Sequence, residues 1–426
     1  MKRTLRYILL FLPLFTQAQS LSIEQLWASF PTSSTQRQAQ LRQHIQQVER
    51  TFDKLDKLPV VYGDLNLQRN LIIPTTPVPA IAFDPSAPAG TYIPLRFATR
   101  WSSKAGIQLE WTLFDPARRG RKDETNLAAE KVEINEKQAK QSWERDATLA
   151  YAAIVLATKQ YAMALQDSTA YAEILQISRD RWQAGRESEI NYLDAQQEME
   201  RKKIQRAEAW TVLAAANIEL QKYAEIDTIL TLSSDIPDIM SYLDSYHGHD
   251  YAVDMAALEV KIARLQTEQT KRQILPTLSF NSYLGAQYFD NDLRLLHMDS
   301  WYGNSYANLS LRIPLSAYVL QRSALQQASW RQQLREEEWQ ERAGHDQVAT
   351  QKREQQKKAA IKKMESLKAI EDLALQKKEV LWAAYEAGRS LLVNYNAANS
   401  AYIAAQQAHW QAQYDWIDLL LQTAAD

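Results

Sequence analysis

The sequence predicts a mainly α-helical protein built from two similar halves, each with a β-hairpin followed by two long antiparallel helices. Three observations predict this fold class: an internal repeat, two long stretches without proline, and four segments in which apolar and polar residues alternate. The alternation is of the kind found in membrane strands, so the full prediction is mainly α with membrane β. This organisation limits the possible classes of function more than any single residue does.

The internal repeat consists of two pairs of matching segments. Residues 184–192 read Ala-Gly-Arg, three further residues, then Ile-Asn-Tyr, and residues 387–395 read Ala-Gly-Arg, three residues, then Val-Asn-Tyr, 203 positions later. Upstream, Leu-Glu-Trp-Thr-Leu-Phe at 109–114 matches Leu-Arg-Ile-Pro-Leu-Ser at 311–316, at an offset of 202. Two matches in the same order at nearly one offset indicate an internal duplication.

The duplication sets the predicted domain organisation. The first repeat covers 20–226 and the second covers 251–426, and a linker at 227–250 joins them. Residues 1–19 are predicted to be a secretory signal peptide, because basic residues near the start precede an apolar run at 7–15 and a short stretch with small residues. That run is about half of the ~20 residues that a membrane-spanning helix needs.

Composition argues against several classes of function. The chain has 49 basic and 51 acidic residues, so no nucleic-acid surface is indicated. It has no cysteine, and hence no thiol nucleophile or disulfide framework. The common hydrolase, zinc-protease, phosphate-binding and dinucleotide-binding motifs do not occur. We therefore expect no catalytic residue, no cofactor and no metal, since the pair His247 and His249 would supply only two ligands.

Two long stretches without proline predict the long helices. Residues 117–236 and 315–426 contain no proline, which costs about 3 kcal/mol inside a helix. Alanine and apolar residues recur in both stretches with heptad spacing, as in packed antiparallel helices. We predict helices over the following ranges: 117–184, returning over 187–226, and 317–387, returning over 390–423. The first would be about 100 Å long, enough to cross a periplasm.

Four segments of period two predict two hairpins, at about 59–115 and about 276–315. The strands are about ten residues long with aromatic residues near their ends, which is typical of outer-membrane barrels; the alternative is an ordinary half-buried sheet. The segment 70–100 holds six prolines and is predicted to be too irregular for a strand pair. One apolar face is assigned to lipid, and its marker residues are Leu109, Trp111, Leu278, Phe280, Leu309 and Leu311.

Four strands are too few to close a membrane barrel on their own. The smallest such barrels have about eight strands, and open sheet edges are not tolerated in lipid. If the strands span a membrane, the protein is therefore an oligomer to which each chain contributes four strands.

Taken together, these features resemble the TolC-type outer-membrane efflux proteins, the exit ducts of drug and type I secretion pumps. The resemblance covers the chain after the signal peptide. It is carried by the repeat, by the strand end at 109–115 leading into the basic helix start at 117–121, by Leu-Pro-Thr-Leu-Ser-Phe at 275–280, and by the two glycine turns. It implies a homotrimer in the bacterial outer membrane, with a twelve-stranded β-barrel continued by a twelve-helix periplasmic α-barrel.

The resemblance also implies partners and a gate. The glycine turns would form the periplasmic tip and dock an adaptor protein and an inner-membrane transporter, while the linker 227–250 would belong to a belt around the tunnel. Relatives often carry aspartates six and nine residues after the second turn glycine, where this chain has Asn394 and Ala397. An acidic ring from this half is therefore missing, and Asn394 is expected to close the pore through hydrogen bonds.

The first half supplies matching positions. Asn191 and Asp194 lie six and nine residues after Gly185, and Asp194 or Glu189 is the expected source of charge. Two arginines beside the glycines are expected to pair with acidic groups on neighbouring helices; the alternative for the whole set is a solvated helix start. The predicted tip and gate residues are Gly185, Arg186, Asn191, Asp194, Gly388, Arg389 and Asn394.

A basic cluster follows the second predicted strand. Arg118, Arg119, Arg121 and Lys122 lie at the start of a helix, where positive charge opposes the helix dipole. We expect a further partner for it, either lipid head groups of the outer membrane or solvent.

The sequence thus predicts a passive trans-envelope channel gated at its periplasmic tip. The alternative, from a different class, is a structural coiled-coil scaffold of the envelope with no transport role. An envelope hydrolase is disfavoured because no nucleophile and base are visible. The cargo, whether drug, metal ion or protein, is expected to be selected by the inner-membrane partner.

Overall fold

The computed structural model describes residues 20–224 and 231–422, so the predicted signal peptide lies outside the described residues. The chain divides into two compact units. The strand unit comprises 43–131 and 257–337, and the helical unit comprises the other described residues. None of the helices in the described ranges is long and apolar enough to cross a lipid bilayer.

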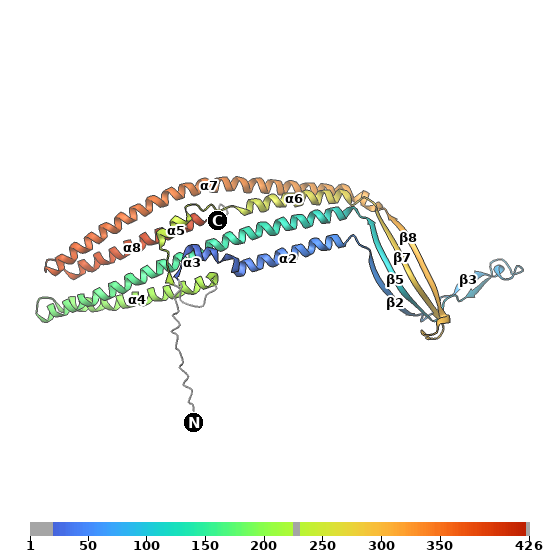
Figure 1. Ribbon diagram of the computed structural model, residues 1–426, viewed down its shortest axis with the longest axis horizontal. Coiled ribbons are helices and arrows are strands. Elements are labelled where there is room, and N and C mark those ends of the chain that lie inside the picture. Colours follow the sequence, from blue (N-terminus) through green and yellow to red (C-terminus); the bar gives the residue numbers. More distant parts are fainter. Residues whose placement is uncertain (1–19, 225–230, 423–426) are drawn as a thin grey trace, which may run out of the picture. The chain divides into compact units, whose positions relative to one another are not determined.

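The strand unit is built on one antiparallel sheet (Figure 1). Its strands are β2 (Val60–Arg69), β5 (Trp101–Phe114), β7 (Thr277–Asp290) and β8 (Trp301–Arg312), in the order β2-β5-β7-β8. The two hairpins therefore lie side by side, and β2 and β8 form the open edges. All four strands fall inside the predicted hairpin ranges.

The expectation that the proline-rich segment 70–100 contains no strand pair is wrong. Within it, β3 (Thr76–Pro79) and β4 (Tyr92–Leu95) form an antiparallel pair. The 3₁₀ turn η2 (Ala80–Ala82) directly follows β3 in the chain. Prolines are tolerated because both members of a two-stranded ribbon are edge strands with one side free of ladder hydrogen bonds. A second 3₁₀ turn, η3 (Met298–Ser300), precedes β8.

The strand register places the six predicted lipid-facing residues on one face of the sheet. Phe280 lies opposite Trp111 on β5 and Leu309 on β8, and Leu278 lies opposite Leu311. Leu109 shares this face through its pairing with Ser282. A register shift between Thr112 and Phe114 marks the end of the regular alternation.

Each hairpin is preceded by a helix that the sequence analysis did not assign. These are α2 (Ser34–Leu55) and α6 (Tyr251–Arg272), both 22 residues long. Their equal length and equivalent positions extend the internal duplication to the segment before each hairpin.

The four long helices lie close to their predicted ranges (Figure 1). They are α3 (Pro116–Gln183), α4 (Glu189–Ala224), α7 (Leu315–Glu386) and α8 (Leu392–Leu421). The first and third are continuous over 68 and 72 residues. A mainly helical chain with an antiparallel sheet is thus the observed fold class.

A compact apolar core in the helical unit involves the predicted linker. Within it, α5 (Ile236–Leu243) and the short α1 (Ile23–Ala28), followed by η1 (Phe30–Thr32), pack against α3 and α8. Beside them, β1 (Ser20–Leu21) and β6 (Thr231–Leu232) form a parallel pair. The Tyr151 hydroxyl fastens this region to α3 by donating to the Leu21 carbonyl at 2.8 Å. Its fully buried large side chains are Ile23, Leu26, Tyr151, Leu220, Ile236, Ile239, Leu243 and Ile417.

Candidate functional site

The two glycine turns have the same backbone geometry. Gly185 and Gly388 have φ angles of +67° and +71°, in the left-handed region where a side chain is disfavoured. The Arg186 N–H donates to the Arg181 carbonyl at 2.8 Å and the Gly185 N–H to the Trp182 carbonyl at 2.9 Å. This is a Schellman helix ending.

The second turn repeats these bonds. The Arg389 N–H donates to the Ala384 carbonyl at 2.8 Å, and the Gly388 N–H donates to the Tyr385 carbonyl at 2.9 Å. The repeated Ala-Gly-Arg sequence therefore encodes one way of ending a helix, used once in each half.

The tyrosine of each repeated Asn-Tyr pair packs back onto the preceding helix. Tyr192 stacks on Trp182 with ring centres 4.9 Å apart and planes 5° from parallel. Tyr395 contacts Trp382 at 5.0 Å. Each contact ties the start of a return helix to the end of a long helix, so this part of the motif serves the turn itself.

A tie between the two hairpins was not predicted from the sequence. Near the end of α3, Arg181 donates to the carbonyls of Tyr385 at 3.2 Å and Glu386 at 3.1 Å. Its guanidinium also lies 4.5 Å from the centre of the Tyr385 ring. The last carbonyls of a helix lack partners within that helix. Arg181 satisfies the Glu386 carbonyl from the other hairpin and gives the Tyr385 carbonyl, which already accepts the Gly388 N–H, a second hydrogen bond. Burial raises the pKa of the Tyr385 phenol, which stays protonated.

Behind this tie, an apolar cluster joins the ends of all four long helices. Its buried members are Tyr171, Ile174, Ala195, Tyr385, Leu392 and Tyr395. Leu392 follows Leu391, the first residue outside α8, so packing begins as soon as the return helix starts.

A buried ion pair lies further along the same hairpins. Lys202 of α4, only 3% exposed, contacts Asp167 of α3 at 2.9 Å and Glu198 at 3.4 Å. Asn399 of α8 donates to the same Asp167 carboxylate at 2.8 Å. The amide therefore joins the second hairpin to a charge network of the first. Breaking such a buried pair is costly because one charge is left uncompensated.

The predicted gate residues divide between two environments. Asn191 and Asp194 line a groove of about 380 Å³ between α4 and α8, together with Ala397. The groove thus brings together three of the gate positions. Asn191 and Asp194 lie six and nine residues after Gly185, and Ala397 lies nine residues after Gly388. Asn394 instead donates to the Ser390 hydroxyl at 3.2 Å, within its own turn.

The two arginines of the repeated motif do not form the expected ion pairs with acidic groups within one chain. In the described ranges, neither the Arg186 nor the Arg389 side chain makes an ion pair. Only their backbone N–H groups hold the turns. Both side chains are exposed, so the inter-helix contact at this end is made by Arg181 instead.

The second candidate surface is the polar face of the sheet. There the Tyr62 hydroxyl donates to Glu110 at 2.6 Å, and Lys104 pairs with Asp64 at 3.1 Å. The Lys104 ammonium also lies 4.1 Å from the centre of the Tyr283 ring. This face is opposite the apolar one, so the sheet is amphipathic across its full width.

Tyr283 lies flat against two glycines on this face. A Cβ built on Gly285 would come within 2.5 Å of the Tyr283 hydroxyl, and one built on Gly106 within 2.6 Å. The ring is 1% exposed as a result. The sequence showed the alternation but not this close approach, which depends on the strand register.

The two histidines of the His247–His249 pair have separate partners. His249 contacts Asp254 through Nε2 at 2.7 Å, and His247 Nδ1 lies 2.9 Å from the Ser245 carbonyl. Within residues 20–224 and 231–422, no group of three or more metal-binding side chains comes together.

No family model matches the chain, and no curated protein matches it either. Several solved structures, however, share its fold over 94% of its length. The Campylobacter jejuni CmeC outer membrane channel is 15% identical, has 84% of its own chain covered and gives a TM-score of 0.68. The Vibrio cholerae outer membrane protein VceC is 13% identical, with 94% of its chain covered and a TM-score of 0.68.

The open state of the Neisseria gonorrhoeae MtrE outer membrane channel is similar to the same degree. It is 16% identical, with 87% of its chain covered and a TM-score of 0.68. The chain therefore has the fold of outer-membrane channels, as the resemblance of its repeat and turns implied.

Proposed function

We propose that the protein is the outer-membrane exit duct of a tripartite efflux or type I secretion system. The observation that carries the proposal is the shared fold with outer-membrane channels over 94% of the chain. The amphipathic sheet and the two continuous long helices supply parts that such a duct needs: a membrane wall and a periplasmic tunnel. We therefore place the protein in the bacterial outer membrane, extending into the periplasm.

The open sheet supports assembly as a homotrimer. Strand directions alternate across β2-β5-β7-β8, so β8 of one copy is antiparallel to β2 of the next when copies are joined edge to edge. Three copies give twelve strands, enough to close a barrel, and closure removes the edges that lipid does not tolerate. Outer-membrane lipid would then cover the face that carries Phe280 and Leu309.

An unpaired apolar stripe on α2 supports the same assembly. Its members recur with heptad spacing and are 50% or more exposed in the single chain: Leu41, Ile45, Val48, Phe52 and Leu55. Such spacing is typical of a helix that packs against another helix. A neighbouring copy would remove this stripe from water at about 25 cal/mol for each Å² buried.

The turn end is proposed as the gate and the docking end. The groove lined by Asn191 and Asp194 presents polar groups from α4 beside α8, and Arg181 holds α3 to the end of α7. Releasing Arg181 would remove the outermost described link between the hairpins while each hairpin kept its own turn, and the Asn399–Asp167 hydrogen bond and the apolar cluster would remain to be loosened. A periplasmic adaptor that binds this end, with an inner-membrane transporter behind it, would favour the released state by binding it more tightly.

The proposed role is passive conduction, with energy supplied by the inner-membrane partner. It is favoured over a structural scaffold, because a scaffold requires neither an amphipathic sheet with two open edges nor a polar face beside a lipid face. We infer no catalytic step and no cofactor for it.

The deciding experiment combines mass and conductance. Purified in detergent, the protein is expected to have the mass of three chains, and in planar bilayers it should give discrete conductance steps. A monomer that stays soluble without detergent and gives no conductance steps would contradict the proposal and favour the structural scaffold.

A further inference from the structure

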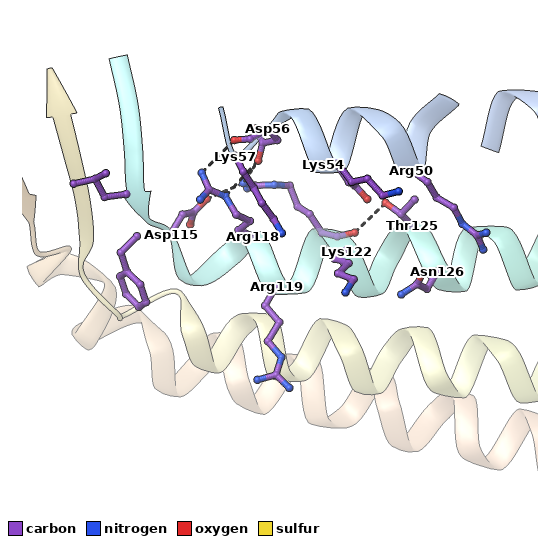
Figure 2. Close-up of a pocket in the computed structure, with 14 residues that line it drawn as sticks. Arg50, Lys54, Asp56, Lys57, Asp115, Arg118, Arg119, Lys122, Thr125 and Asn126 are labelled. Atoms are coloured by element: carbon purple, nitrogen blue, oxygen red, sulfur yellow. Dashed lines mark hydrogen bonds and ion pairs between the residues drawn. The ribbon is translucent and has the colours of Figure 1, made fainter. Parts of the chain in front are cut away.

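A basic groove lies where the sheet meets the helices, within the strand unit. It has a volume of about 600 Å³ and lies between the end of α2 and the start of α3, next to the last residues of β5 (Figure 2). Seven basic and three acidic side chains line it. The basic ones are Arg50, Lys54, Lys57, Arg118, Arg119, Arg121 and Lys122.

Two of the arginines are held by the protein itself. Arg121 bridges Asp56 at 3.0 Å and Asp115 at 2.8 Å. Arg118 donates to the carbonyls of Asp56 at 3.2 Å and Thr112 at 3.0 Å, while its buried Nε has no hydrogen-bond partner. Two of the three carboxylates of the groove are thus already engaged in fixing the walls.

The remaining positive charge is not neutralised within the chain. In the part of the chain that the structure describes, Arg50, Lys54, Lys57 and Lys122 form no ion pair, and all four are exposed. Arg119 projects from the side of α3 away from α2 (Figure 2). Arg119 and Lys122 also lie in the first two turns of α3, where the helix dipole is positive. An anion in the groove would offset both.

The internal duplication provides a built-in comparison. At the offset of 202, the positions of Arg118, Arg119, Arg121 and Lys122 correspond to four uncharged residues at the start of α7, which are Leu320, Gln321, Ser323 and Ala324. The same strand-to-helix junction therefore forms with a single arginine, Arg322 at the position of Gly120, in place of a basic cluster. The charges of the first half are not needed to make the turn, which points to a ligand.

The groove borders the apolar face of the sheet. Leu113 and Phe114, at the end of β5, line it and are 39% and 51% exposed. After the register shift Phe114 pairs with Leu278, which lies on the proposed lipid face. A ligand that fits has a phosphate beside an apolar chain, since compact ammonium groups bind phosphate as point charges.

We propose that this groove binds the phosphate head group of an anionic phospholipid in the membrane leaflet nearest the helices, with the acyl chains along the face of β5. The inference rests on the proposed outer-membrane location. It assigns the ligand to lipid rather than to free phosphate because charge and apolar surface adjoin.

The test uses the full-length protein in a neutral detergent and the triple variant Lys54→Ser, Lys57→Ser, Lys122→Ser. Native mass spectrometry counts bound short-chain phosphatidylglycerol, with phosphatidylcholine as the uncharged comparison. The variant is expected to bind phosphatidylglycerol about a hundredfold more weakly, which corresponds to about 1 kcal/mol for each lysine. A matched control, Lys352→Ser, Lys358→Ser, Lys362→Ser, removes three exposed lysines of α7 and should bind as the unmodified protein does.

Each outcome supports or contradicts the proposed lipid site. Equal binding by the two lysine variants, or equal binding of the two lipids, would show that the groove is not the binding site. Full competition by glycerol phosphate or inorganic phosphate at matched concentration would assign the groove to free phosphate and overturn the lipid. If the serine variant fails to assemble, Lys54→Arg, Lys57→Arg, Lys122→Arg must keep lipid binding for the proposal to stand. Absence of a trimer and of conductance in the unmodified protein would count against the proposed function, whereas a conducting trimer without bound lipid counts against this site alone.

Discussion

Arg181 of α3 stacks on the Tyr385 ring of α7 at 4.5 Å and donates to the Tyr385 carbonyl at 3.2 Å. One side chain thus caps a helix that ends 205 residues later in the sequence. The contact joins the two halves of the duplication at their turns. It is one of the inter-hairpin links, together with the Asn399–Asp167 hydrogen bond, that an adaptor would have to break in the proposed gating.

We expect Arg181→Gln to loosen the turn end. A hydrogen bond to a charged group contributes about 1.5–3 kcal/mol, and this variant removes two such bonds while each Schellman turn stays intact. Single-channel conductance in a planar bilayer should rise clearly above that of the unmodified trimer. The matched control is Arg186→Ser, whose side chain makes no ion pair within the described chain.

The opposite ranking would identify a different gate. If Arg186→Ser and Arg389→Ser, combined with Asn394→Ala, open the channel while Arg181→Gln leaves it unchanged, the gate depends on contacts between copies. If neither variant changes conductance in an intact trimer, these residues only shape the turns.

The turns were predictable because glycine carries a local signal. A left-handed residue that ends a helix favours glycine whatever its surroundings, and the repeat made the assignment secure. Arg181 could not be found in this way, because its partners are two backbone carbonyls in another helix. Backbone acceptors have no sequence signature, and only the packing of the hairpins brings them together.

The strands likewise include features with a local sequence signal, which were predicted, and features without one, which were not. Alternation at residues 278–280 and 309–311 predicted one apolar face, and the register bears out that these residues share it. The pairing of Pro77 with Pro94 was not predicted, because proline has no backbone N–H to donate and is found in sheets mainly on edge strands. Helix α2 was not predicted, because the proline-free stretch 32–58 is short and the absence of proline over so few residues is a weak helical signal.

Replacing Gly388 by alanine should destabilise the second turn. Its φ of +71° places any side chain in a region that costs about 1–2 kcal/mol. The comparison is Gly344→Ala within α7, where a Cβ would meet nothing within 4 Å and alanine should gain up to about 1 kcal/mol. Thermal unfolding followed by helical circular dichroism should give shifts of opposite sign, and shifts of the same sign would contradict the helix-ending role.

Two carboxylates on α3 should respond to pH in opposite directions. Burial raises the pKa of Glu144, partly offset by Lys140, whereas a hydrogen bond from Lys137 lowers the pKa of Glu133. The stability linked to Glu144 is present below its unfolded pKa near 4.5 and is lost as pH rises above it. That linked to Glu133 is present above 4.5 and is lost as pH falls.

The matching variants test these signs. At pH 7.5 Glu144→Gln should raise Tm by about 1–2 °C, and Glu133→Gln should lower it slightly. Near pH 4 both differences should shrink, because the carboxyls then approach the neutral state that glutamine imitates. The Tm difference between Glu144→Gln and the unmodified protein should be larger at pH 7.5 than at pH 4. A smaller difference at pH 7.5 would show that the ion pair of Glu144 with Lys140 outweighs the effect of burial.

The close packing of Tyr283 predicts a sharp difference between two glycines of the sheet. A Cβ on Gly285 would lie 2.3 Å from the Ala105 carbonyl oxygen, which is backbone and cannot swing aside. Gly285→Ala should therefore reduce the yield of assembled oligomer. Gly303→Ala on β8, where a Cβ meets nothing within 4 Å, should assemble normally. Equal yields on a native gel would show that the strands are not paired in this register.

The proposed lipid face is tested most directly by two neighbouring residues of β7. Phe280 lies between Trp111 and Leu309 on the apolar face, and Asn281 lies between Glu110 and Asn308 on the polar face. An arginine that faces lipid costs about 2–4 kcal/mol at the middle of a membrane and less toward its edges, and Phe280 lies near the helix end of β7, so Phe280→Arg should impair insertion and trimer formation in part. Asn281→Arg places its charge beside the Glu110 carboxylate, in a polar setting, and should insert as the unmodified protein does.

The measurement is the fraction of each variant recovered as trimer from outer membranes, with total expression as the reference. A deficit for Phe280→Arg alone is expected, because only that charge faces lipid. Equal recovery of both variants would mean that neither face meets lipid, and the sheet would then be a soluble half-buried one. A deficit for Asn281→Arg alone would reverse the two faces and turn the polar residues outwards, which the Lys104–Asp64 pair on that face makes physically unfavourable in lipid.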